Sequence, residues 1–414
     1  MAGTLAGCGG AGSGSGEVTL RLVAADYGDS PANSSAKYWD RLARGFEEQH
    51  PGVKVDVSVY SWKDVDRKVK DMVAAGHAPD MAQIGAYADY AAAGKLYEAG
   101  DVLSIPVQAD FTSELSEAGE VDNVQYGMPF AASTRLLFYN KTLFSQAGIT
   151  PPTTWSELAS DAQALKAKGV KFPFALPLGP EEAQAETMQW MLAGDSAAGG
   201  GDGYLGALGS YDIDSPRNVA TFTWLRDDLV GRGLTGPVAP AQLNRADAFA
   251  AFTRGEVGML NGHPSLMKAA KAKGVDFGMV PLPGQDGPAN STMGVSDWMA
   301  AFKQGGHQAQ IRDFLDFTYS ERNVLAFSRE YDLLPVTSSA QQTMAASSQD
   351  AALKPFLDEL PTARMYPAGK TSWAGVSADV KKRIGQAVGP GGNPGAVLSQ
   401  VQQTATTADS ATAG

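Results

Sequence analysis

Cysteine is nearly absent from this chain of 414 residues, and so are long apolar runs. A single cysteine excludes an internal disulfide framework and any zinc site built on several thiolates. The four histidines (His50, His77, His263 and His307) are scattered and give no metal-ligand spacing. We therefore expect neither a metal nor a cofactor. No segment approaches the roughly 18 to 20 apolar residues that a membrane-spanning helix needs.

Positive charge is also scarce, because 33 Lys and Arg residues face 45 Asp and Glu residues, a net charge of -12. No basic stripe is present, which argues against a nucleic-acid partner. Hydrophobic residues make up 43% of the chain and charged residues only 19%. That balance predicts a folded protein with real cores, arranged as two domains or one large one.

The only cysteine stands in the tetrapeptide Leu5-Ala6-Gly7-Cys8, directly before the Gly/Ser-rich run of residues 9–16. Such a tetrapeptide is typical of bacterial lipoproteins, in which the cysteine carries the lipid that anchors a soluble domain. A Gly/Ser run is a flexible tether. We expect residues 1–16 to be a tether anchored through lipidated Cys8. The alternative is a chance match in an Ala/Gly-rich chain.

Beyond the tether, hydrophobic periodicity predicts alternating strands and helices. Strands show short apolar or alternating runs and helices show one apolar face. The predicted strands are Val18–Ala24, Val53–Val59 and Asp80–Ile84, and the predicted helices are Tyr38–Gln49 and about Trp62 to Ala75. This alternation is typical of α/β proteins.

Several longer segments resemble, in order, those of a known family. They are FEEQHPGVKV, AAGHAPDMAQIGAYADYAAAGKL, YGMPFAASTRLLFYNKTLFSQAGITPPTTWSEL, GEVGMLNGHPSLM, FGMVPLPG and MGVSDWMAAF. Together they resemble the extracellular solute-binding proteins of the family that includes maltose-binding protein. The resemblance covers nearly the whole chain after the tether.

This resemblance implies a type II periplasmic binding protein fold, with two α/β lobes, a hinge and a ligand cleft between the lobes. By analogy, the first lobe takes residues 17–132 plus 280–335, and the second takes 133–279 plus 336–404. The function implied is a monomeric, non-catalytic receptor that delivers a carbohydrate to the permease of an ATP-driven (ABC) importer. It would work on the outer face of the cytoplasmic membrane. Residues 405–414 have almost no large apolar side chains, and we expect them to be frayed.

Sugar sites combine aromatic planes for the C–H face of a pyranose with polar groups for its hydroxyls. On the first lobe, the strand ends and the resemblance predict ligand contacts from residues that follow strands or lie at crossovers. These are Asp26, Tyr27, Tyr87, Ser133, Arg135, Asp297 and Trp298. Maltose-binding protein has a glutamate where this chain has Ser133, which weakens any expectation of maltose itself.

On the second lobe, the resemblance predicts ligand contacts from Glu181, Glu182, His263, Arg364 and Trp373. Each prediction has a plainer alternative. Tyr27, Tyr87, Trp298 and Trp373 could be core aromatics, since most aromatic side chains are buried. Glu181 and Glu182 could serve only as first-turn charges that a helix dipole favours.

Two other classes of function stay open at this stage. A glycoside hydrolase needs only two suitably spaced carboxylates and no sequence motif, so composition does not exclude it. A receptor for a polyamine or an osmolyte would need aromatic planes around a cation. Mixed carboxylates with single aromatic rings favour a sugar.

Overall fold

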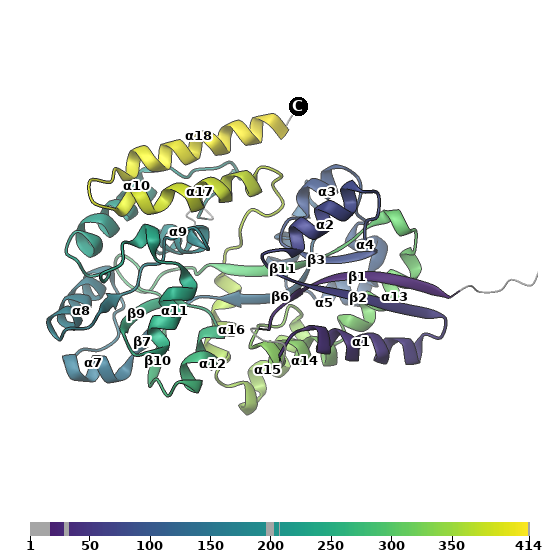
Figure 1. Cartoon of the computed structure of the whole chain (residues 1–414), viewed down its shortest axis with the longest axis horizontal. Helices are drawn as coiled ribbons and strands as arrows, with labels where there is room; N and C mark the ends of the chain where they lie inside the picture. Colours follow the sequence, from purple (N-terminus) through teal and green to yellow (C-terminus); the bar gives the residue numbers. More distant parts are fainter. Residues whose placement is uncertain (1–16, 29–32, 196–202, 207, 413–414) are drawn as a thin grey trace, which may run out of the picture.

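The protein forms two lobes, each built on its own β-sheet and joined by extended segments through the middle of the molecule (Figure 1). This computed structural model describes residues 17–28, 33–195, 203–206 and 208–412. Cys8 and the predicted tether therefore lie outside the described residues.

The first lobe is built on a five-stranded sheet whose strand order is β2-β1-β3-β11-β6. Parallel β1 and β2 pair along their full length, from Val18 opposite Val53 to Asp26 opposite Ser61. Strand β11 is antiparallel to both of its neighbours. The bounds are β1 (Val18–Asp26), β2 (Val53–Ser61), β3 (Met81–Ile84), β6 (Met128–Thr134) and β11 (Gly294–Ala301), with a separate hairpin of β4 (Glu120–Val121) and β5 (Val124–Gln125).

The longer helices of this lobe cover the sheet by burying an apolar stripe. In α1, for example, the buried residues Trp39, Leu42, Ala43 and Phe46 recur at helical spacing. The helices of this lobe are α1 (Ala36–Gln49), α2 (Val65–Ala74), α3 (Ala88–Ala92), α4 (Ala99–Val102), α5 (Ile105–Asp110), α6 (Ser113–Glu117), α13 (Gln308–Thr318) and α14 (Glu321–Tyr331), with a 3-10 turn at Lys303–Gly305. The five elements predicted between Val18 and Ile84 are confirmed.

The second lobe is built on a four-stranded sheet with the order β10-β7-β9-β8. Its strands are β7 (Leu136–Asn140), β8 (Phe172–Phe174), β9 (Val257–Gly262) and β10 (Phe277–Val280). Its helices are α7 (Lys141–Ala147), α8 (Trp155–Ala167), α9 (Ala183–Ala193), α10 (Pro216–Trp224), a π-helix at Leu225–Val230, a 3-10 turn at Pro240–Gln242, α11 (Arg245–Thr253), α12 (Ser265–Ala272), α17 (Trp373–Val388) and α18 (Pro394–Thr412). Helix α8 begins at a capping box between Thr154 and Glu157.

Three segments cross between the lobes. The first runs from β6 to β7 through Arg135, and the second from β10 to β11 through residues 281–293. The third comprises residues 363–372, between the 3-10 turn that ends at Thr362 and the start of α17 at Trp373. It lies beside the start of β11, where the Arg364 amide donates to the Thr292 carbonyl and the Gly294 amide donates to the Arg364 carbonyl, both at 2.9 Å. Backbone hydrogen bonds therefore tie the third crossover to the end of the second, at the start of β11.

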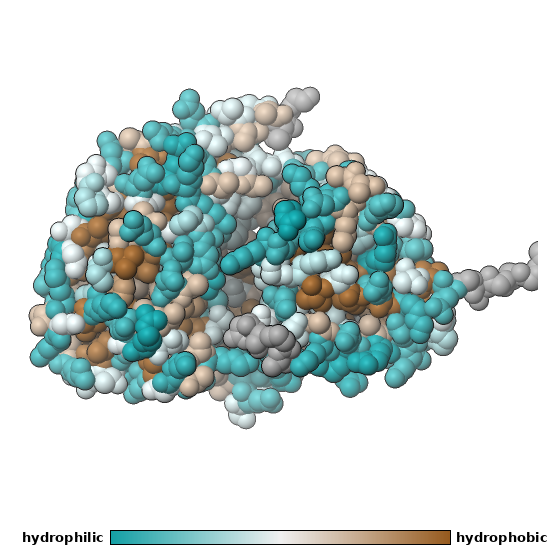
Figure 2. Space-filling view, in the orientation of Figure 1, coloured by the Kyte–Doolittle hydropathy of each residue, from teal (hydrophilic) through white to brown (hydrophobic). Residues whose placement is uncertain are grey.

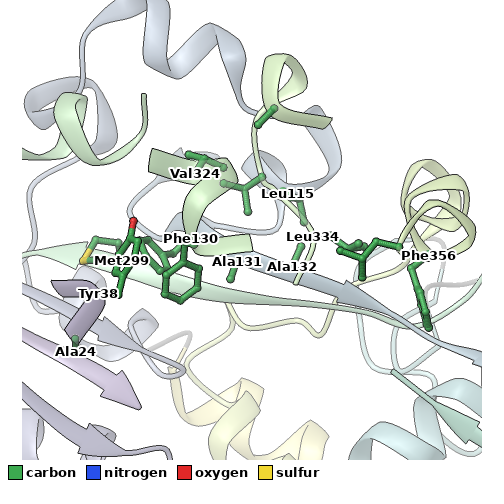
Figure 3. Close-up of a cluster of buried hydrophobic side chains, with 14 of the residues drawn as sticks. Ala24, Tyr38, Leu115, Phe130, Ala131, Ala132, Met299, Val324, Leu334 and Phe356 are labelled. Carbon is green, nitrogen blue, oxygen red and sulfur yellow. The ribbon is translucent and has the colours of Figure 1, made fainter. Parts of the chain in front are cut away.

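The cores continue from each lobe into these crossovers. Figure 3 shows Phe130, Ala131 and Ala132 of β6 packed among side chains of neighbouring elements, with Phe356 farther along. Helix α16 (Lys354–Glu359) carries Phe356, which is fully buried, and the Thr134 hydroxyl donates to the Phe356 carbonyl at 2.8 Å. Among the described residues, no helix is both long and apolar enough to cross a membrane.

One predicted lobe boundary needs correction. We expected the second lobe to resume at Val336, but α15 (Ser338–Ala346) is held by the first lobe. The amide and hydroxyl of Ser339 donate to Asp110 at 2.9 and 2.5 Å, and α15 packs on α14. The chain joins the helices of the second lobe only at α17, after the third crossover and the 3-10 turns at Ser348–Asp350 and Leu360–Thr362. The other boundaries stay predictions.

The expectation of a frayed tail is also wrong for the residues that the structure describes. Helix α18 continues to Thr412 and packs along α17. Leu398, Val401 and Ala405 are fully buried. A single stripe of small apolar residues at helical spacing is enough to dock a helix, although the segment is poor in large side chains.

Candidate functional site

The crossover strands carry a row of the predicted polar residues on one face. Ser133 lies opposite Val295 in the β6–β11 register, and Asp297 lies two residues further along β11. Paired residues of adjacent strands point to the same side, and so do residues two apart along one strand. Ser133 and Asp297 therefore share a face. Arg135, two residues after Ser133, follows it into the second lobe.

The third crossover adds to the same face. Met293 is paired in parallel with Arg364. Since residues two apart along a strand point to the same face, the side chains of Arg364 and Tyr366 lie on the same face as those of Met293 and Val295. Tyr366 was not among the predicted site residues. Its ring is partly exposed, whereas Arg364 is exposed. The row of Ser133, Arg364 and Tyr366 forms what we call the cleft floor.

A hydrogen-bonded chain defines the first-lobe wall beside this floor. The Tyr27 hydroxyl donates to Asp297 Oδ2 at 2.7 Å and accepts from Gln83 Nε2 at 2.6 Å. Gln83 is fully buried, and its Oε1 accepts from the Ala25 amide at 3.1 Å. The Tyr27 ring meets Trp62 edge to face, with centroids 5.4 Å apart. Hydrogen bonds that start at buried Gln83 therefore fix the positions of Tyr27 and Asp297.

The Asp297 carboxyl on this wall is easily protonated. Its pKa is raised to about 7, mainly by burial; the hydrogen bond from Tyr27 lowers the pKa and the negative charge of Asp66 raises it. Burial also raises the pKa of Asp66, which accepts from the Gly85 amide at 3.0 Å. A β-bulge lies between Asp297 and Trp298. Bulges commonly re-aim side chains at functional sites.

Asp26 is committed to its own loop. One carboxylate oxygen accepts from the amides of Gly28 and Ser35 at 3.0 and 2.8 Å, and the other accepts from the Ser34 hydroxyl at 2.8 Å. Burial raises its pKa, but these hydrogen bonds outweigh burial and leave the pKa below its ordinary value. The predicted ligand contact is thus a loop organiser that starts α1.

Tyr87 and Trp298 are core residues, which corrects two of the predicted ligand contacts. Tyr87 is 0% exposed and Trp298 only 3%. Their rings meet each other at 5.5 Å, and the Tyr87 hydroxyl donates to the Ala118 carbonyl at 2.9 Å. The rings pack closely over Gly127, where a Cβ atom would come within 2.8 Å of the Tyr87 ring. Neither ring is open to a ligand.

On the second lobe, four charged side chains form a neutral box. Arg135 Nη2 donates to Glu182 Oε1 at 2.7 Å, and Arg245, the first residue of α11, pairs with the other oxygen of Glu182. Arg245 Nη2 also donates to Glu181 Oε1 at 2.8 Å. The sequence analysis missed Arg245, because its place in the box depends on a contact 64 residues from Glu181.

The two arginines of the box lower the pKa of Glu182 within it and of the nearby His263. Burial would raise the pKa of Glu182, but Arg135 and Arg245 outweigh burial and hold that pKa below its ordinary value. Burial and the same two arginines hold the pKa of His263 well below its usual range, so its ring is neutral. His263 Nδ1 lies 2.9 Å from the Ser265 hydroxyl.

Beneath the box lies a carboxyl group that sequence analysis also missed. Glu186 is 7% exposed and accepts from Trp190 Nε1 and Asn261 Nδ2, both at 2.8 Å. Burial raises its pKa to about 7. A small cavity of about 10 Å³ between Arg135, Glu186 and Asn261 is just large enough for one water molecule.

Glu186 predicts a pH dependence of stability. Its folded pKa lies above the ordinary value, so ionisation in the folded state costs free energy, and stability falls as pH rises from about 4.5 to about 7. We expect Glu186→Gln to reduce the loss of unfolding free energy between pH 5 and pH 8 by about 1 to 3 kcal/mol. Urea unfolding of both proteins at the two pH values measures this. An identical pH dependence would contradict the assignment.

Arg135 carries a second prediction. Its side chain is 7% exposed, and its loss leaves the Glu182 carboxylate with Arg245 alone. We expect Arg135→Ala to lower the free energy of unfolding by about 2 to 3 kcal/mol, because breaking a buried pair leaves a poorly compensated charge. Adding Glu182→Gln should recover part of this loss. Strictly additive effects of the two changes in urea unfolding would show that the two groups are not coupled.

An aromatic wall stands on the second-lobe side. Trp373, the first residue of α17, is partly exposed, and its ring stacks on Tyr366 with centroids 5.2 Å apart and an interplanar angle of 28°. Tyr204 supports it from below at 5.0 Å. Trp373 packs against the hydrophobic clusters of both lobes. Trp373, the one aromatic ligand contact predicted on the second lobe, is thus partly exposed and held by other aromatic rings.

Space-filling representation shows a hollow between the lobes, rimmed mainly by hydrophilic residues (Figure 2). Next to the cleft floor, a cavity of about 610 Å³ is lined by residues of both lobes. Glu117 and Glu120 come from the first lobe, whereas Arg364, Tyr366 and Lys370 come from the third crossover. The cavity therefore carries several charged side chains, and its lining includes the aromatic ring of Tyr366 but not Trp373.

These features define a two-lobed binding protein with a polar cleft at the crossovers. The chain belongs to the bacterial extracellular solute-binding protein family, whose model matches residues 31–325. The predicted α/β fold of the maltose-binding-protein type is confirmed.

Individual relatives agree with this family. A protein of Brucella abortus (strain 2308), described as a binding protein, is 27% identical over 385 residues, which cover 92% of this chain and 90% of that protein. The sn-glycerol-3-phosphate-binding periplasmic protein UgpB of Shigella dysenteriae is 24% identical over 364 residues, 78% of each chain. A cyclic alpha-maltosyl-1,6-maltose binding protein from Arthrobacter globiformis superposes with a TM-score of 0.76 at 19% identity, covering 95% of this chain and 99% of that one.

Proposed function

We propose that this protein is the solute receptor of an ABC importer and binds a carbohydrate between its lobes. One observation carries the proposal. Partly exposed Trp373, stacked on Tyr366, and Tyr27, hydrogen-bonded to Asp297, pack against the same hydrophobic cluster of the first lobe. An aromatic plane for the C–H face of a sugar, with carboxylates for its hydroxyls, is the combination that carbohydrate recognition needs.

The charges of the cleft favour a sugar over an anionic solute. Asp66 and Asp297 on the first lobe repel a phosphate group when they are ionised, and two arginines of the second lobe are already paired with Glu181 and Glu182, which leaves Arg364 and Lys370 as the other cations near the cleft. Among the relatives, the Arthrobacter protein is named for a maltose-based sugar and UgpB for a phosphorylated polyol, sn-glycerol 3-phosphate. The acidic wall supports the neutral sugar as ligand.

Closure of the cleft is the working step that we infer. A ligand that touches Trp373 on one lobe and Asp297 on the other stabilises the closed arrangement only because its contacts are incomplete when the lobes part. The permease then recognises the closed pair of lobes, and the sugar is released unchanged. No proton transfer to the sugar is needed, so we propose no catalytic activity.

A thermal-shift screen of the purified protein tests this function. The panel contains mono- and oligosaccharides, sn-glycerol 3-phosphate, polyamines and betaines. A ligand at 100 times its Kd stabilises the folded state by about 2.7 kcal/mol, enough to raise the midpoint of unfolding by several degrees. We expect a sugar to give the largest shift and to be recovered intact. Stabilisation by glycerol phosphate or a cation alone, or recovery of a cleaved sugar, would contradict the proposal.

We also propose that the receptor is a monomer, held at the outer face of the cytoplasmic membrane by lipid on Cys8. The Gly/Ser-rich residues 9–16 would let the lobes reach the permease. Expression in a lipoprotein-processing bacterium, followed by mass spectrometry of the N-terminal peptide, tests the anchor. A diacylated cysteine is the expected result, and an unmodified Met1 peptide in the membrane fraction would contradict it.

A further inference from the structure

The N-terminus of α17 lacks the usual side-chain cap. Ser372 is its N-cap residue and is 5% exposed, yet its side chain makes no capping hydrogen bond. A serine at this position normally accepts from an amide of the first turn. Here the Ser372 hydroxyl donates to Asp409 Oδ1 of α18 at 2.5 Å. Because that proton is committed, the Tyr211 hydroxyl, 3.1 Å away, donates to Ser372.

The same carboxylate holds a second residue of the segment before α17. Lys370 Nζ donates to Asp409 Oδ2 at 3.0 Å and lies 5.3 Å from the centre of the Tyr211 ring. Lys370 and Asp409 are each about 30% exposed, so this ion pair alone contributes little. The hydrogen bond from buried Ser372 to a carboxylate is the stronger of the two, because it is charge-assisted and desolvated.

Helix α18 is itself anchored at this point. Gln402 Nε2 donates to the Tyr211 carbonyl at 3.1 Å, and Gln402 Oε1 accepts from the Ile213 amide at 2.8 Å. Two turns later, Asp409 reaches the N-terminus of α17. Negative charge at that end of a helix is favoured by the helix dipole, so Asp409 adds a favourable charge beside the first turn of α17.

We propose that Asp409 is a positioning residue for the ligand cleft. By holding Ser372 and Lys370, it fixes the first turn of α17 and hence the plane of Trp373. The last turns of α18, which runs along α17 and ends at Thr412, thereby belong to the binding machinery (Figure 1). This inference rests on the proposed function in one respect only, namely that the ligand Trp373 contacts is a sugar.

Fluorine NMR of the full chain tests the positioning without any ligand. All seven tryptophans are replaced by 5-fluorotryptophan, and Trp373→Phe identifies the resonance of Trp373. We expect Asp409→Ala to shift or broaden that resonance by more than its linewidth and to leave the other six unchanged. Asp409→Asn, which still offers an acceptor to Ser372, should retain most of the native shift.

Ser399→Ala is the matched control, because it removes another side-chain contact of α18 with the second lobe, the 2.6 Å hydrogen bond to Asp214. It should leave the Trp373 resonance in place. The proposal is overturned if Asp409→Ala leaves that resonance unmoved, or if all seven resonances change together, which would indicate general loosening. Since no sugar is present, neither result depends on whether the protein is a sugar receptor.

Discussion

Trp373→Ala is expected to weaken sugar binding about a hundredfold, since a central aromatic contact commonly contributes 2 kcal/mol or more. The ring is the partly exposed aromatic plane on the second-lobe wall, and the rings of Tyr204 and Tyr366 pack against it. Isothermal titration with the sugar that gives the largest thermal shift measures the loss.

Trp373→Phe separates stacking from folding. A phenyl ring keeps a plane for the sugar and fills most of the space, so its affinity should stay within about fivefold of the original. Circular dichroism and the unfolding midpoint show whether either variant is damaged as a whole. If Trp373→Ala binds the sugar within twofold of the unchanged protein, Trp373 is not the stacking surface.

Gly369→Val is expected to weaken binding at least tenfold by keeping the lobes apart. Gly369 belongs to the third crossover and lies against β4 of the first lobe, where a Cβ atom would come within 1.9 Å of the Glu120 carbonyl oxygen. Backbone cannot yield as a flexible side chain can. The clash therefore raises the free energy of the arrangement in which this crossover contacts the first lobe, which we infer to be the one that binds ligand, and the apparent affinity falls with its population.

Gly375→Ala is the control for this substitution. Gly375 lies six residues further on, in α17, and a Cβ atom there meets nothing within 4 Å. Alanine should leave the affinity unchanged and stabilise the helix slightly. The same titration, with small-angle scattering of both proteins, measures affinity and lobe separation. Unchanged affinity in Gly369→Val would show that this contact plays no part in closure.

Periodicity was sufficient to predict the first strands and helices. Alternating valines gave β2, and an apolar stripe gave α1, because these patterns depend only on neighbours in the sequence. The family resemblance added the two-lobed fold, the crossovers and Trp373. It could not predict which aromatic rings face the core. Tyr87 follows a strand, as a ligand residue would, but it turns inward where Gly127 leaves room for its ring.

The remaining parts of the site depend on contacts between distant segments. Arg245 joins the charged box through Glu181 and Glu182, and Tyr366 enters the floor because the third crossover pairs with β11. Asp409 lies in the segment that was predicted to be frayed, because its contact with Ser372 spans 37 residues and leaves no local signal. No local pattern marks these residues, since each is an ordinary charged or aromatic side chain in its own segment.

A crystal structure of the protein with the sugar that gives the largest thermal shift would test the proposed cleft most directly. We expect a pyranose ring lying on Trp373, with hydroxyl groups hydrogen-bonded to Asp297 on the opposite wall. The lobes should meet around the sugar. A sugar bound elsewhere on the surface, with Trp373 and Asp297 both untouched, would contradict the proposed site.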